Sequence, residues 1–134
     1  MRNKKLDQLI VQLENYLECL KQFNYFVNLS RGKKFVPEDE NQFLEVKAII
    51  VQELEIISAS IDCSSPSREE VHTLVSTAPS IRYLAESNEG NLRSLENHWH
   101  KVYVGFQAIL GQLKVKQRQL EEKSVISSVF GKKG

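Results

Sequence analysis

Apolar residues at both ends of the chain recur at alternating intervals of four and three residues. The N-terminal series is Leu6, Ile10, Leu13, Leu17, Leu20 and Val27, with Asn24 at one polar position. The C-terminal series is Leu92, Leu95, Trp99, Val102, Phe106, Ile109, Leu113 and Leu120, with Gln117 at the polar position. An α-helix completes a turn in about 3.6 residues, so this spacing lines apolar side chains along one side of a helix. The pattern predicts amphipathic helices that pack through these stripes.

Two helices are expected in the N-terminal half. The first covers residues 3–29 and ends before Gly32, which we expect to adopt the left-handed conformation that closes many helices. The second begins at Pro37, because proline suits the first helical turn, and ends before Asp62. We expect this second helix to be the most buried one, because further apolar residues widen its stripe: Ile49, Val51 and Ile56.

Two more helices are expected in the C-terminal half. Ser67 and Glu70 have the spacing of a capping box, in which each residue satisfies the backbone amide of the other. The helix that they open is interrupted at Pro79 and resumes briefly after it. The last helix is expected over residues 91–122.

Short connections between successive helices favour antiparallel neighbours. The sequence therefore predicts an all-α protein, an antiparallel up-down four-helix bundle with long first, second and last helices and a short, proline-kinked third. We expect a bundle domain over residues 1–123 and an amphipathic tail over residues 124–134. The tail can fold back on the bundle, bind a partner or touch a membrane through four apolar residues: Val125, Ile126, Val129 and Phe130.

Composition excludes several classes of protein. The 134 residues carry a net charge of +1, so no overall field attracts nucleic acid or an anionic membrane, and neither is an expected partner. No segment approaches the roughly 20 apolar residues that span a bilayer. The two cysteines, Cys19 and Cys63, lack metal-binding or redox spacing and are expected to be reduced thiols. We expect a cytoplasmic protein, of bacterial origin.

One local group offers chemistry. Arg93 is followed at suitable spacing by His98 and His100, and this arrangement resembles the motif of HEPN ribonucleases. The resemblance implies a helical, dimeric enzyme in which arginine and histidine flank the scissile phosphate of RNA. Histidine suits proton transfer near neutral pH, and arginine suits phosphate binding. Ser94 follows Arg93 where family members commonly carry Asn, Asp or His.

The alternative interpretation of this group is structural. Arg93 can form an exposed ladder with Glu96 or Asn97 on one side of the helix. Two histidines two residues apart point in different directions on a helix, so we expect no metal there, and no other cofactor motif is present.

Two further features concern association. Small groups of basic residues near the first helix start and near Lys114, Lys116 and Arg118 are expected to meet at one end of the bundle. A weak binder of RNA or of lipid headgroups could use this end, and a solvated helix end is the simpler interpretation. Gly105 interrupts a strong helix, which suggests close approach of another helix, within the chain or across a dimer.

These observations favour a non-enzymatic interaction protein, a subunit, adaptor or regulator that associates with itself as a homo-oligomer or with a protein partner. The expected binding residues are Gly105 and the apolar residues of the tail. The dimeric ribonuclease that uses Arg93 with His98 or His100 is the alternative.

Overall fold

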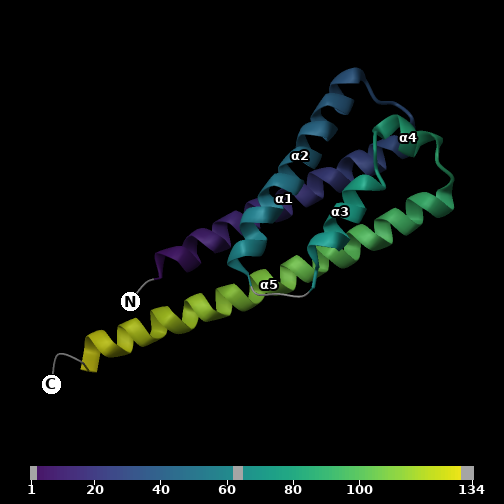
Figure 1. Cartoon of the computed structure of the whole chain (residues 1–134). Coiled ribbons are helices and arrows are strands. Elements are labelled where there is room, and N and C mark those ends of the chain that lie inside the picture. Colours follow the sequence, from purple (N-terminus) through teal and green to yellow (C-terminus); the bar gives the residue numbers. More distant parts are fainter. Residues whose placement is uncertain (1–2, 62–64, 131–134) are drawn as a thin grey trace.

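The computed structural model describes residues 3–61 and 65–130, apart from the side chains of residues 124 and 126–130. The fold is all-α, and the described residues contain no strand. Figure 1 shows the helices in chain order, which are α1 (Lys4–Gly32), α2 (Pro37–Ser60), α3 (Arg68–Ser76), α4 (Ile81–Glu86) and α5 (Glu89–Phe130).

Local signals explain where α1 begins and ends. The side chain of Asn3 accepts a hydrogen bond from the Leu6 amide at 3.1 Å and caps the first turn. At the other end, Lys33 rather than Gly32 adopts the left-handed conformation, with φ of 54°. The prediction for Gly32 was therefore wrong, because the helix continues through Gly32 and closes when the Lys33 amide donates to the Ser30 carbonyl.

The next two helices start at the expected signals. Pro37 begins α2, where the Asp39 side chain accepts from the Val36 amide at 2.9 Å. Ser67 accepts from the Glu70 amide at 3.1 Å and caps α3, as predicted. The reciprocal half of the box is missing from the described contacts, and Glu70 Oε2 is buried without a hydrogen-bond partner.

The last helix is longer than expected. It starts at Glu89 and passes Glu122 without interruption to Phe130. No glycine or proline lies between Gly111 and Gly131, so nothing in this segment stops the helix. At about 1.5 Å per residue, α5 is about 63 Å long and α1 about 43 Å.

Helix α1 is central to the packing. It contacts α2, α4 and α5, and the residue pairs show that α2 and α5 both run antiparallel to it. Figure 1 shows α5 lying along α1 and α2 crossing it, with α3 beside α2 and α4 near the C-terminal end of α1. Helix α3 contacts both α2 and α5.

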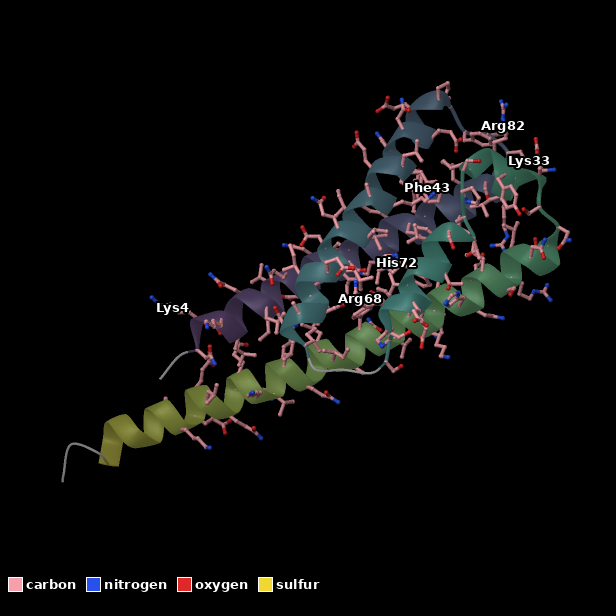
Figure 2. All side chains as sticks on the ribbon, in the orientation of Figure 1. Lys4, Lys33, Phe43, Arg68, His72 and Arg82 are labelled. Carbon is pink, nitrogen blue, oxygen red and sulfur yellow. The ribbon has the colours of Figure 1, made fainter. Side chains whose placement is uncertain are left out.

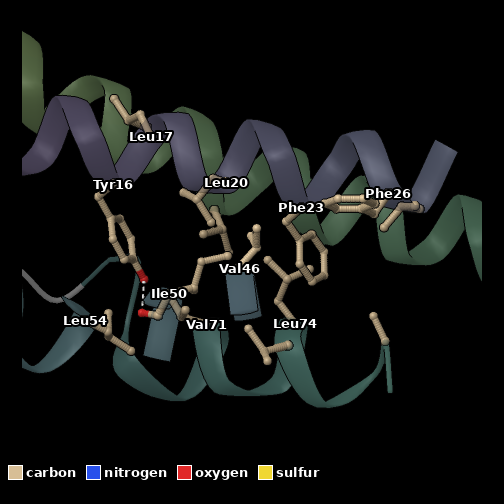
Figure 3. Packing of buried hydrophobic residues seen from close by; sticks show 14 of the residues in the cluster. Tyr16, Leu17, Leu20, Phe23, Phe26, Val46, Ile50, Leu54, Val71 and Leu74 are labelled. Atoms are coloured by element: carbon tan, nitrogen blue, oxygen red, sulfur yellow. Dashed lines mark hydrogen bonds between the residues drawn. The ribbon is translucent and has the colours of Figure 1, made fainter. Parts of the chain in front are cut away.

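The core lies where α1 faces its neighbours. Phe23 and Phe26 of α1 pack against Phe43 of α2, with ring centroids 5.4 and 5.6 Å apart. The buried Tyr16 hydroxyl donates to the Ile50 carbonyl at 3.0 Å, as Figure 3 shows.

The prediction that the second helix is the most buried was wrong. Ile49 and Ile56 of α2 keep 41% and 46% of their surface exposed. Helix α1 instead carries the largest set of buried residues, because both other long helices, α2 and α5, pack against it, whereas α2 packs against α1 and the two short helices.

Two polar contacts attach the segment around Pro79 to α2. The Lys47 ammonium donates to the Pro79 carbonyl at 3.0 Å, and Glu40 accepts from the Ile81 amide at 2.5 Å. Burial lowers the pKa of Lys47, although the nearby Glu40 carboxylate opposes that shift. The kink at Pro79 is thus held by α2, which lets α4 reach α1.

Contacts along the whole of α1 set its register with α5. The Trp99 indole donates to the Leu20 carbonyl at 2.7 Å near the middle. Gln117 donates to Asp7 at 2.7 Å near the start of α1, and Arg31 pairs with Glu89 at 3.0 Å near its end.

Gly105 and Gly111 of α5 give a matched test of stability. A Cβ atom at Gly105 would lie 2.7 Å from Cγ of Pro66, whereas a Cβ at Gly111 would meet nothing within 4 Å. We expect Gly105→Ala to lower the free energy of unfolding by about 1–2 kcal/mol, because overpacking against the rigid ring outweighs the helix-propensity gain. Gly111→Ala is expected to raise it by up to about 1 kcal/mol. Urea unfolding followed by circular dichroism measures both, and equal effects would contradict the packing assigned to Gly105.

Candidate functional site

Arg93, His98 and His100 lie together in the first third of α5. Arg93 and His100 are exposed and share one side of the helix, seven residues and about 10 Å apart. His98 is half-buried and is rotated by about 140° from Arg93. It lines a groove of about 470 Å³ between α5 and the α3–α4 region, together with Ser76, Thr77 and Ser94. Within one chain, Arg93 and His98 therefore do not face a common point.

The structure also differs from the structural alternative for Arg93, in which Arg93 forms an exposed ladder with Glu96. Glu96 bonds Arg31 of α1, and the same guanidinium pairs with Glu89 at 3.0 Å. No ion pair of Arg93 occurs among the contacts of the described residues. The carboxylate that we expected beside Arg93 instead ties α5 to the C-terminal end of α1.

Trp99 lies between the two histidines in the sequence, and its side chain contacts α1 and the next turn of α5. Its half-buried ring stacks on Tyr103 with centroids 4.8 Å apart, and its indole nitrogen is bonded to the Leu20 carbonyl. The tryptophan therefore anchors this turn of α5 on α1.

The third histidine belongs to an exposed cluster between α2 and α3. Arg68 donates to both carboxylate oxygens of Glu55 at 2.5 and 2.6 Å, and Nε2 of His72 lies 3.9 Å from that carboxylate. Figure 2 shows Arg68 and His72 on α3. In the part of the chain that the structure describes, no three His, Cys, Asp or Glu side chains form a candidate metal-binding group.

The larger groove lies beside this cluster and is partly apolar. It has a volume of about 590 Å³ and runs between α2, the start of α3 and α5, with Ile57, Pro66 and Phe106 in its wall. Glu70 Oε2 and Asn24 Oδ1 are the described side-chain atoms that are buried without hydrogen-bond partners, and neither residue lines this groove.

The basic residues near the start of α1 and those around Lys116 of α5 do lie near each other. Lys5 and Lys116 line one groove, which also contains Ile56 of α2. Acidic residues share this end, because Lys114 pairs with Glu14 at 3.4 Å. Other basic residues lie at the opposite end of the molecule from Lys4, as Figure 2 shows for Lys33 and Arg82. The end near Lys4 therefore carries mixed charge.

The residues expected to bind a partner have different surroundings. Gly105 lies against Pro66 of the same chain, so the space in front of it is filled. Val125 is exposed, whereas the side chains of Ile126, Val129 and Phe130 lie outside the described part of the structure.

Helix α5 also exposes valines that lie outside the predicted binding residues, apart from Val125. Val104, Val115 and Val125 keep 44%, 52% and 62% of their surface exposed. They follow a heptad spacing of their own, on a side of α5 different from that of the buried Val102 and Phe106. This second spacing was readable in the sequence, but the stronger stripe of large apolar residues obscured it.

Part of this exposed face continues beyond the bundle. Because Gln117 lies opposite Asp7, the start of α1 at Lys4 lies opposite about residue 120 of α5. The last ten or so residues of α5, roughly 15 Å of helix, extend past that point. Figure 1 shows the C-terminal end of α5 beyond the N-terminal end of α1.

Comparison with known protein families, with curated proteins and with solved structures gave no match for this chain. Among the described residues, no helix combines the length and apolar character that crossing a bilayer requires.

The reactivity of the half-buried Cys19 thiol can be tested directly. Burial, together with the nearby Glu53 and Glu18 carboxylates, raises the pKa of Cys19. Because the thiolate is the nucleophile, we expect Cys19 in a Cys63→Ser variant to react with iodoacetamide several-fold more slowly at pH 8.5 than it does in urea. The rate should keep rising above the ordinary thiol pKa. Folded-state alkylation as fast as in urea would contradict this environment.

Proposed function

We propose that this protein is a non-enzymatic interaction protein, a subunit, adaptor or regulator that associates through α5 with a second copy or with another protein. The observation that carries the proposal is the exposed face of α5 that contains Val104, Val115 and Val125, here called the valine face. This face continues past the N-terminal end of α1. Burial of apolar surface stabilises association by roughly 25 cal/mol per Å² removed from water. A helix that extends beyond its own bundle can offer such surface without unfolding.

The proposed scaffold is an antiparallel up-down four-helix bundle in which α3 and α4 together form the third leg. Support comes from the pairings of α1 with α2 and α5, and from the contacts of α3 with both α2 and α5. The proposed setting is the bacterial cytoplasm, where isolated cysteines remain reduced.

The valine face can be tested with a matched surface control. We expect Val115→Glu and Val125→Glu to weaken self-association or partner capture at least tenfold, because a carboxylate would be buried in the contact. Val11→Glu on α1 places the same charge at a valine that is 55% exposed, and it should have little effect. Light scattering over a concentration series and capture with tagged protein measure association, while circular dichroism checks folding.

Truncation after Lys123 gives an independent test, because it removes the end of α5 that lies beyond α1. Association should weaken without loss of the bundle's helical signal or cooperative unfolding. Association that persists in both the truncated chain and the valine variants would contradict the proposal.

A dimeric ribonuclease that uses Arg93 with His98 or His100 is the second candidate. Its support is that Glu96 is occupied by Arg31, so the exposed Arg93 is not tied to that carboxylate. Within one chain, Arg93 and His98 point to different sides of α5, and Arg93 and His100 are about 10 Å apart along it. This candidate therefore requires a dimer that brings Arg93 and a histidine of different copies together.

RNA cleavage separates this candidate from the first. If the enzyme hypothesis holds, purified protein cleaves single-stranded RNA, and Arg93→Ala and His98→Ala each reduce the rate by about 100-fold or more. Arg82→Ala is the control, since Arg82 is exposed and lines a different groove, together with Phe35 and Pro37. RNA that stays intact with wild-type protein would remove the candidate.

A further inference from the structure

A second heptad series follows the side of α5 that the bundle leaves uncovered. Its described members are all exposed and are separated by alternating intervals of four and three residues. We call this series the outer seam, and its members are Val104, Ala108, Gly111, Val115, Arg118, Glu122 and Val125. Position 129, also a valine, continues the spacing. Spacing of this kind aligns side chains along a face that a second helix can cover.

The outer seam lacks cover from the described residues of its own chain. Its valines remain about half exposed or more, while the inner stripe at Val102, Phe106 and Ile109 is buried. Gly111 adds a second observation, because a Cβ there would meet nothing within 4 Å. Glycine within a helix costs about 1 kcal/mol relative to alanine, and no contact inside the described chain accounts for it here.

The charged residues of the seam are complementary to those of a second copy of the same seam. Arg118 and Glu122 are exposed, opposite in charge and one turn apart. If a second α5 lies antiparallel with its Glu122 opposite Arg118, symmetry also places its Arg118 opposite Glu122. The same register sets Val115 opposite Val125, and Gly111 opposite position 129. This alignment satisfies both charges and pairs apolar residues with apolar residues from Gly111 onward, while Val104 and Ala108 lie beyond the overlap of the two helices.

Other alignments of two identical seams are less favourable. A parallel pair would place Arg118 opposite Arg118 and Glu122 opposite Glu122. An antiparallel shift of one heptad would place Arg118 opposite Val115 or position 129. Polar residues in a helical seam commonly select register in this way, because wrong alignments leave charges unpaired.

We infer that the outer seam binds a second copy of this chain in an antiparallel two-helix contact, with Arg118 opposite Glu122 of the other copy. This inference rests on the proposed function and names its partner. The two-fold axis passes near Leu120, opposite the start of α1. The two bundles therefore lie at opposite ends of the paired helices, and each α1 remains on its own side of α5.

Charge reversal tests the register. Arg118→Glu and Glu122→Arg each replace two attractive pairs by two repulsive ones, and each is expected to raise the dimer dissociation constant about tenfold or more. The double variant restores both pairs and should dimerise like the wild type. An equimolar mixture of the two single variants should form a heterodimer. Lys123→Glu, at an exposed position next to the seam, is the matched control and should leave dimerisation unchanged.

Sedimentation equilibrium of the full chain and its variants measures these constants, and circular dichroism verifies that each variant folds. Weakening in both single variants together with recovery in the double variant and in the mixture supports the inference. Wild-type protein that stays monomeric at several hundred micromolar overturns it, as does a dimer indifferent to both charge reversals. If the wild type is monomeric but captures a different protein that Val115→Glu loses, this inference fails while the proposed function holds.

Discussion

The structure depends on the burial of α1. This helix presents Tyr16 and Phe23 toward α2 while its other sides contact α4 and α5, so its apolar surface is shared among elements from the whole chain. Because α2 and α5 are joined mainly through α1 and α3, neither could bury its stripe in the absence of α1. Stabilisation by burial is proportional to area and has no preferred direction, so it explains compactness but does not by itself select one register.

Register comes from polar groups that need particular partners. Tyr16 reaches the Ile50 carbonyl, Trp99 reaches the Leu20 carbonyl, and Gln117 reaches Asp7. Each such bond stabilises the fold by only about 1 kcal/mol, yet an alignment that leaves a buried polar group unpaired costs more. Gln117, the polar residue of the C-terminal stripe, has such a partner in Asp7. Asn24, the polar residue of the N-terminal stripe, keeps a buried Oδ1 atom without a hydrogen-bond partner.

Helix α5 has two faces with different roles in this account. Its inner stripe belongs to the core, and its tryptophan, glutamine and Glu96 attach it to α1. Its outer face exposes valines and a pair of opposite charges where the bundle offers no cover. The groove near His98 and the cluster at Arg68 and His72 lack this continuity, since each is a local feature between neighbouring elements.

The sequence alone determined the helical class, the inner stripes, the serine cap of α3 and the break at Pro79, because these depend on residues within one or two turns. Tertiary structure decided which helix is central, why Ile49 and Ile56 stay exposed, and why Glu96 pairs with Arg31 rather than Arg93. It also distinguished Gly105, which faces Pro66, from Gly111, which faces open space. Burial and pairing depend on neighbours that are distant in the chain, and a local pattern carries no information about which neighbours those are.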